Sequence, residues 1–205
     1  MPGPHLGHPR IWRHLLRVSR VVGVISSGTY EVGPSQGTLQ LHTGREGVAK
    51  KVGHDLVIEA KQWTAKVNVD ADDLTRSTAS VTVDTRSLEV VSGEGGAKAL
   101  SDKDRKDIKE NIDKKVLKTD KFPDITFTSS RVESSGPDKV TVHGDLTIMG
   151  TARPASMDIT LSGSKANGTM TLKQTDWGIK PFSALMGALK LADVLQVKVE
   201  ATVPS

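Results

Sequence analysis

Hydrophobic and polar residues alternate with a period of two along most of the chain from residue 29 onward. In the last such segment Leu195, Val197 and Val199 alternate with Gln196 and Lys198. Side chains of a strand point alternately to its two faces, so this pattern predicts amphipathic β-strands. The same alternation recurs in segments 39–42, 56–58, 65–70, 81–84, 125–128, 140–148, 157–161 and 170–173.

Short turn segments separate these strands and favour antiparallel neighbours. Every predicted strand has one apolar face, and closing the sheet would bury these faces together and remove unpaired edges. The sequence therefore predicts an all-β fold, an antiparallel up-and-down barrel of about eight strands, with a two-sheet sandwich as the alternative. Val, Thr, Ala and Gly outnumber large aromatic residues on these faces, which favours an internal cavity; a well-packed valine-rich core is the alternative.

Two segments depart from the period of two. Residues 101–116 predict an inserted helix with Ser101 as N-cap and an apolar stripe of Ile108, Ile112 and Val116. Phe182 to Leu191 predicts a short second helical segment. Both segments are expected to cover the barrel, either as lids over its mouth or as plugs and braces.

Residues 1–28 are expected to form a basic extension to a single domain at 29–205. Residues 11–25 have helical periodicity, with Arg13, Arg17 and Arg20 on the polar face. The longest apolar run is about five residues, too short for a secretory signal or a spanning helix. A cytoplasmic protein is therefore expected. Residues 10–25 could contact an anionic membrane surface, or pack as a helix on the domain itself.

Composition narrows the function classes. The chain has 205 residues and no cysteine, which excludes disulfides and thiolate metal sites. Its net charge of +4 equals the number of arginines in residues 1–28, which contain no Asp or Glu, so the domain itself is neutral. A neutral domain with only 3% aromatic residues offers no basic patch for nucleic acid, and no nucleic-acid partner is expected.

The sequence shows no catalytic constellation. His54, His143 and Asp145 are the nearest candidates for acid–base chemistry, but they are not spaced as a known motif. Adjacent His54 and Asp55 on one strand would face opposite sides. We therefore expect no enzyme, no catalytic residue, no metal and no cofactor.

Three segments resemble the YceI-like family of lipid-binding, lipocalin-like barrels. Residues 120–130 resemble a family strand entry, residues 144–154 a family hairpin, and residues 175–179, followed by a valine-rich strand, the family's C-terminal part. The resemblance covers residues 29–205. Residues 101–117 lack the family's usual Arg-Asp-x-His-Leu stretch, and Gly53 to Leu56 replaces a usual Gly-x-Phe, so the chain resembles a divergent branch.

The resemblance implies a barrel that carries or stores a polyisoprenoid or similar amphiphile, and homodimers are common in the family. A polar headgroup would sit at the mouth near the lysines and arginines of residues 98–121. Two alternatives are a structural or interaction barrel with a filled core, and an enzyme that modifies such lipids. The apolar residues expected to contact the ligand are Ile58, Val67, Val69, Val81, Val83, Phe127, Val142, Leu146, Ile148, Ile159, Leu161, Leu172, Trp177, Phe182 and Met186.

Overall fold

The computed structural model describes residues 25–203. Its strands are β1 (Gly28–Val32), β2 (Gly37–His42), β3 (Arg45–Glu46), β4 (His54–Ala60), β5 (Trp63–Val69), β6 (Thr78–Asp84), β7 (Leu88–Gly95), β8 (Asp124–Gly136), β9 (Lys139–Ile148), β10 (Thr151–Ser162), β11 (Lys165–Lys173), β12 (Ser183–Ala184), β13 (Leu189–Leu191) and β14 (Val194–Thr202). The one α-helix described is α1 (Asp102–Asn111), which continues into the π-helical turn η4 (Ile112–Val116).

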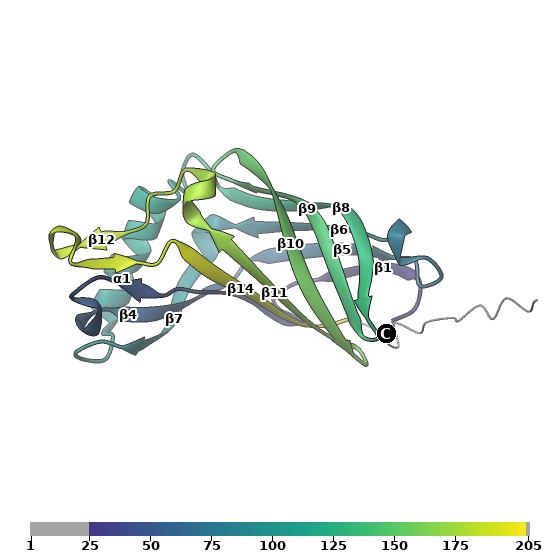
Figure 1. The fold of residues 1–205 in the computed structure, drawn as a ribbon, viewed down its shortest axis with the longest axis horizontal. Coiled ribbons are helices and arrows are strands. Elements are labelled where there is room, and N and C mark those ends of the chain that lie inside the picture. The colour runs from purple at the N-terminus through teal and green to yellow at the C-terminus, as the bar shows by residue number, and fades with distance from the viewer. Residues whose placement is uncertain (1–24, 204–205) are drawn as a thin grey trace, which may run out of the picture.

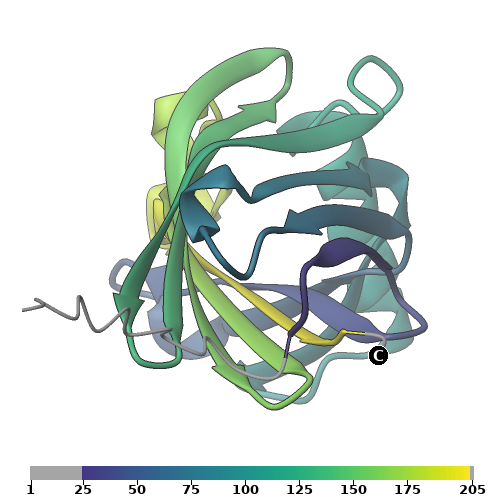
Figure 2. The ribbon, with the colours of Figure 1, turned by 90° about the vertical axis from the view of Figure 1, so that its right-hand side faces the viewer.

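Eleven strands form one antiparallel sheet in the order β1-β5-β6-β8-β9-β10-β11-β14-β2-β4-β7. The sheet curls around an interior that is seen end-on in Figure 2. The pairing of β14 with β2 brings the last long strand back beside the first part of the sheet, so that Val197 opposes Leu41. The all-β antiparallel fold is confirmed, and the long strands do not divide into the two layers of the alternative sandwich. The predicted closure is not complete, because the sheet curls into a half-barrel whose end strands β1 and β7 are not paired with each other.

The strand count differs from the predicted eight because long stretches of chain are interrupted. Only residues 61 and 62 separate β4 from β5, and the short turn η3 (Thr85–Ser87) separates β6 from β7. The two stretches pair as one bent hairpin: the inner strands β5 and β6 pair with each other, and the outer strands β4 and β7 pair with each other. Alternation predicts that a stretch is extended, but it does not show where a bend breaks the ladder.

The inserted helix is confirmed at its start and differs at its end. The hydroxyl of Ser101 accepts a hydrogen bond from the Asp104 backbone N–H at 3.2 Å, and the Asp104 carboxylate accepts one from the Ser101 N–H at 2.9 Å. This capping box fixes the first turn of α1. Ile108, Ile112 and Val116 pack against the core as the stripe predicted, but residues 112–116 form a π-helix rather than an α-helix.

The prediction of a second helical segment is wrong. Residues 182–191 form a hairpin in which β12 pairs with β13, joined by the short turn η6 (Leu185–Gly187). The spacing of Phe182, Leu185, Met186 and Leu189 imitates a helical period. Leu185 and Met186 instead have left-handed backbone angles, with φ of 52° and 54°, which end any helix there. β13 also pairs with β3, which makes a small second sheet.

Helix α1 and the β12–β13 hairpin lie at one end of the elongated barrel, and β14 ends at the other (Figure 1). None of the described helices is long and apolar enough to cross a membrane. The predicted basic helix of residues 11–25 lies outside the described residues except for Ile25, so its contact with a membrane stays a prediction.

Candidate functional site: an apolar cavity inside the barrel

The curled sheet encloses a cavity of about 300 Å³. Inward-facing side chains from the two end strands of the sheet line it, Val32 of β1 and Leu88 of β7, as does Val199 of β14 in between. The alternation seen in the sequence explains this lining, because every second residue of each strand faces inward. The volume is at the lower end of the range of roughly 300–1,000 Å³ that is usual for small-molecule sites.

The residues of helix η4 and the adjoining loop cover part of the cavity. Ile112, Val116 and Leu117 belong to its lining, and the backbone N–H of Leu117 donates to the Ile112 carbonyl oxygen at 2.9 Å. The capped helix α1 positions this segment over the barrel interior. The inserted helix therefore closes part of the site, as expected of a lid or plug.

None of the described residues that line the cavity is charged. Thr43 and Gln174 are the two polar residues among the described residues that line it, apart from the indole of Trp63. The Thr43 hydroxyl accepts from the Leu56 N–H at 2.9 Å, and the Gln174 amide nitrogen donates to the Ala192 carbonyl at 2.9 Å. Both side chains thus form hydrogen bonds with backbone groups, and the wall that faces an apolar ligand is almost entirely apolar.

Trp63 is the exception in this lining. Its side chain is 5% exposed, and its indole N–H has no hydrogen-bond partner within the part of the chain that the structure describes. A buried donor without a partner is uncommon, because its lost hydration costs about 1–3 kcal/mol.

Eleven of the fifteen residues predicted to contact a ligand line this cavity. They are Ile58, Val67, Val81, Val83, Phe127, Val142, Leu146, Ile148, Ile159, Leu172 and Phe182. These eleven side chains therefore face inward, as the alternation predicts. Whether these side chains touch a ligand stays a prediction.

The other four predicted residues lie outside the lining. Met186 is fully exposed at the tip of the β12–β13 hairpin. Trp177 is buried in the core, and Leu161 packs against a second cluster around Val132 and Val140. Val69 is half-buried at the end of β5, opposite Gly28.

Sequence reasoning missed Trp63, Thr43 and Gln174. The two polar residues gave no signal, because Thr and Gln are ordinary on exposed faces and at strand ends. Trp63 begins β5 directly after a bend, where the alternation starts again. Other lining residues were recognised as strand residues but not as site residues, among them Leu39, Leu41, Ile125, Met157, Met170, Leu195 and Val197.

Residues 98–121, where lysines and arginines are expected to bind a polar headgroup, contain nine cationic residues, three of which form ion pairs within the helix. Lys109 pairs with Asp113 and Lys114 with Glu110, each at 2.6 Å and each with a spacing of four residues. In the second pair the acidic residue comes first, which is the more favourable order on a helix. The Arg105 guanidinium donates to the Val90 carbonyl at 2.8 Å, which ties α1 to β7. These contacts fix the helix in place. Five other lysines of this segment form no ion pair with a described residue, so a headgroup site there stays a prediction.

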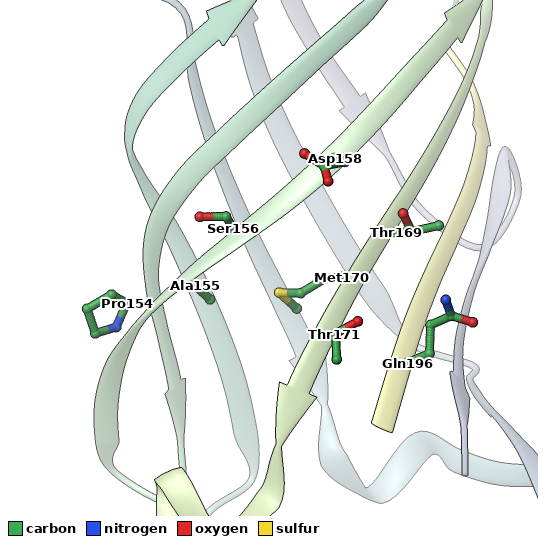
Figure 3. A pocket seen from close by; sticks show the side chains of 8 residues that line it. All are labelled: Pro154, Ala155, Ser156, Asp158, Thr169, Met170, Thr171 and Gln196. Carbon is green, nitrogen blue, oxygen red and sulfur yellow. The ribbon is translucent and has the colours of Figure 1, made fainter. Parts of the chain in front are cut away.

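The outer wall carries an open depression of about 450 Å³ between β10, β11 and β14 (Figure 3). The β10–β11 ladder runs from the Ser162–Lys165 pair only to the Asp158–Thr169 pair, and beyond it the two strands separate. Met170 lines both this depression and the inner cavity, so its side chain is part of the wall between them. Polar outward residues such as Thr171 and Gln196 form the rest of the depression.

A row of polar side chains crosses the outer face beside this depression. The His143 ring nitrogens lie 2.7 Å from the Ser156 hydroxyl and 2.9 Å from the Glu133 carboxylate. The hydrogen bond with His143 lowers the pKa of Glu133. Ser156, His143 and Glu133 have the residue types and contacts of a catalytic triad. Ser156 is exposed, however, and the three side chains face solvent rather than the cavity. It is an ordinary set of cross-strand contacts between β8, β9 and β10.

The acid–base candidates named from the sequence do not meet. His54 on β4 contacts the Lys98 carbonyl oxygen at 2.7 Å, whereas His143 and Asp145 belong to β9. None of these three residues lines the cavity. The described residues also contain no group of three or more His, Cys, Asp or Glu side chains that could hold a metal ion.

Comparisons with known proteins agree with this architecture. The YceI-like domain family model matches residues 13–203. A UPF0312 protein of Pseudomonas savastanoi pv. phaseolicola is 31% identical over 130 residues, which are 58% of this chain and 62% of that protein. A UPF0312 protein of Pseudomonas putida strain F1 is 34% identical over 85 residues, 37% of this chain and 44% of that protein. The matches thus span less than two thirds of these relatives.

Two solved structures show the same fold. Burkholderia cenocepacia BcnA matches with a TM-score of 0.64 and 20% identity, over 85% of this chain and 99% of BcnA. The Campylobacter jejuni YCEI protein matches with a TM-score of 0.54 and 16% identity, over 72% of this chain and 84% of that protein. At such low identity these likenesses concern the fold alone.

Proposed function

Because this chain belongs to the YceI-like domain family, we propose that it binds a single-chain amphiphile, such as a polyisoprenoid, inside the barrel and carries or stores it unchanged. The observation that supports this proposal most is the lining of the cavity, which is apolar and carries no charge. Burying a charge there would be costly, so the buried part of the ligand is an uncharged chain.

Burial of an apolar chain supplies ample free energy. Each buried methylene group contributes about 0.8 kcal/mol, against the cost of ordering the chain. A volume of about 300 Å³ suits one slender chain rather than a lipid with several acyl chains.

A carrier fits the lining better than an enzyme does. Hydrolysis or isomerisation of a lipid needs a placed acid or base next to the reacting bond. The described cavity lining contains no titratable carboxylate, histidine or lysine. The filled-core alternative is supported less, because the interior retains a cavity. Cytoplasmic localisation and homodimer formation stay predictions.

The proposal is tested by extracting the purified full-length chain with organic solvent and analysing the extract by mass spectrometry. The expected result is an amphiphile in about equimolar amount, or saturable binding of farnesol when the extracted protein is titrated. An extract without lipid, together with no binding of farnesol or palmitate, would overturn the proposal. Chemical change of the recovered lipid on incubation with the protein would favour the enzyme instead.

A matched pair of variants locates the binding. Val81 lines the cavity, whereas its neighbour Thr82 points to the exposed face of β6. Val81→Trp fills the cavity and should abolish farnesol binding, and Thr82→Trp should leave it intact. Circular dichroism and thermal unfolding show that both variants are folded. Equal binding by both folded variants would place the ligand outside the cavity.

A further inference from the structure

Two neighbouring loops expose large apolar side chains at the end of the barrel that carries α1. Val48 and Val52 come from residues 44–53, and Leu185 and Met186 come from the β12–β13 hairpin, which protrudes at this end (Figure 1). Val48 is 94% exposed and Met186 fully exposed. We call these four residues the tip surface.

Backbone contacts hold the two loops together. The Ala49 N–H donates a hydrogen bond to the Ala188 carbonyl oxygen at 2.9 Å, and β3 pairs with β13 so that Glu46 opposes Lys190. A side chain added at Gly47 would collide with the Ala188 carbonyl. The tip surface is therefore one surface built by two segments far apart in the sequence.

The backbone at the hairpin tip is disfavoured for the residues it carries. Leu185 and Met186 both have positive φ, 52° and 54°, where glycine or asparagine would be relaxed. The turn holds both apolar side chains outward, with Leu185 59% exposed. Burial within the barrel explains neither feature, and strained positions of this kind occur where a surface has a function.

Lysine side chains flank the tip surface, whereas Arg45 is paired with Asp55 at 3.4 Å. Residues 44–53 and 180–191 contain one carboxylate, that of Glu46, and no other acidic residue. Their cationic residues are Arg45, Lys50, Lys51, Lys180 and Lys190. Among the described residues, Lys50 and Lys51 of the turn η1 (Lys50–Val52) form no ion pair, and both are exposed beside Val48 and Val52. Exposed apolar groups flanked by lysines are typical of surfaces that bind anionic membranes.

The base of the same hairpin reaches the cavity. Phe182 and Leu191 both line it, and the Leu191 N–H donates to the Phe182 carbonyl oxygen at 2.9 Å. The tip surface and one end of the cavity thus belong to a single short hairpin. A bilayer in contact with the tip would lie next to that end of the cavity.

We propose that this end of the barrel docks on a bilayer that contains anionic lipids. Leu185 and Met186 enter the boundary between headgroups and acyl chains, and Lys50 and Lys51 lie near the anionic headgroups. Docking itself requires no ligand in the cavity and goes beyond lipid binding. Its use in loading or releasing a lipid rests on the proposed function.

The experiment measures cosedimentation of the full-length chain with vesicles of phosphatidylcholine alone or with 30 mol% phosphatidylglycerol, a composition of roughly one anionic lipid in three. The wild-type chain should bind only the anionic vesicles, and less at high salt. Lys50→Gln/Lys51→Gln should weaken binding about 25-fold, roughly fivefold for each lysine. Leu185→Ser/Met186→Ser should weaken it about tenfold or more.

A matched control removes two lysines from the other end of the barrel. Lys139 and Lys165 are exposed in the β8–β9 and β10–β11 hairpins, and Lys165 lies opposite Thr202 at the end of β14. Lys139→Gln/Lys165→Gln has the same net charge as Lys50→Gln/Lys51→Gln and should bind anionic vesicles within twofold of wild type. Equal loss in both lysine variants would show attraction by overall charge and would overturn the proposal.

Other occupants give distinct results. Wild-type binding by the tip variants would mean that another segment, such as residues 10–25, holds the chain on the vesicles. Failure of the wild type to bind anionic vesicles, with a dimer in sedimentation that Leu185→Ser/Met186→Ser dissociates, would assign the tip to a second copy of this chain. Either result overturns membrane docking and leaves the farnesol test of lipid binding unaffected.

Discussion

The indole N–H of Trp177 donates a hydrogen bond to the Leu146 carbonyl oxygen at 3.0 Å, across 31 residues of sequence. Trp177 ends the short turn η5 (Gln174–Trp177) after β11, whereas Leu146 lies on β9. The bond therefore connects two elements that bound the region where β10 and β11 separate. It also accounts for the burial of Trp177 in the core rather than in the cavity lining.

Trp177→Phe should destabilise the fold. The Leu146 carbonyl would lose its partner in a buried position, at a cost of about 1–3 kcal/mol in the free energy of unfolding. The measurement is urea unfolding followed by circular dichroism. Trp63→Phe is the matched control, because it removes an equally buried indole whose N–H has no partner among residues 25–203. Trp63→Phe should cost clearly less, and equal losses would assign the effect to ring volume alone.

Asp193 makes the neighbouring turn depend on pH. Its carboxylate accepts hydrogen bonds from the Thr175 hydroxyl at 2.6 Å and the Thr175 backbone N–H at 2.9 Å. The Thr175 hydroxyl, followed by its N–H and Lys173, lowers the pKa of Asp193 below its ordinary value of 3.8. Because the folded pKa is the lower one, the carboxylate contributes its full stability above pH 3.8, and this contribution is lost as the pH falls below 3.8 and through the lower folded pKa.

Asp193→Asn should therefore flatten the loss of stability between pH 5 and pH 3 without abolishing it, since other carboxylates contribute too. Urea midpoints measured across this range test the prediction. Asp145→Asn, at an exposed position on β9, is the control. An unchanged pH profile in Asp193→Asn, or the same change in both variants, would contradict the role given to Asp193.

The segment 144–154 begins with Gly144, and the neighbouring strand β8 explains why glycine is needed there. A methyl group at this position would lie 2.3 Å from the Thr128 carbonyl oxygen and 2.9 Å from the Ser129 Cα. Both are backbone atoms of β8, next to the irregularity between Ser129 and Arg131 in the β8–β9 ladder. The strand pair has no room for a side chain there.

Gly144→Ala should destabilise the protein by about 1–3 kcal/mol, as overpacking of a filled site does. Gly136→Ala, in the same strand pair, serves as its control, because the added methyl group would meet only the Lys139 side chain at 3.3 Å or more. Thermal unfolding measures both. Similar unfolding temperatures for the two variants would show that β8 and β9 can shift apart without cost.

The sequence predicted the barrel and most of the cavity because both depend on a period of two. Once Val81 or Phe127 is placed inward, its cross-strand partners follow. The prediction failed where the period is ambiguous: Leu185 and Met186 stand at helical spacing, yet positive φ values turn them outward. A pattern of apolar residues cannot show backbone handedness when no glycine marks the turn.

Other parts of the site depend on long-range contacts that no local pattern records. Thr43 and Gln174 are buried because Leu56 and Ala192 supply their hydrogen-bond partners. Trp177 looked like a lining residue, but its polar N–H is held by a carbonyl of β9. Alternation alone therefore does not predict whether a polar residue or a tryptophan lines the cavity.

Ser101 controls the helix that covers the cavity, although it touches no cavity residue itself. Its hydroxyl and backbone N–H both contact Asp104, and these contacts lower the pKa of the Asp104 carboxyl. Ser101→Ala removes the N-cap and should destabilise α1 by about 1 kcal/mol. Since α1 leads directly into Ile112 and Val116, opening of the helix uncovers part of the cavity.

In Ser101→Ala, hydrogen exchange should accelerate about fivefold in residues 102–111 and little in β8 to β11. Ser135→Ala, at an exposed position of β8, should leave both regions unchanged. Uniform acceleration over the whole barrel in Ser101→Ala would show that α1 opens only when the entire fold does, and that the helix is not a separate cover.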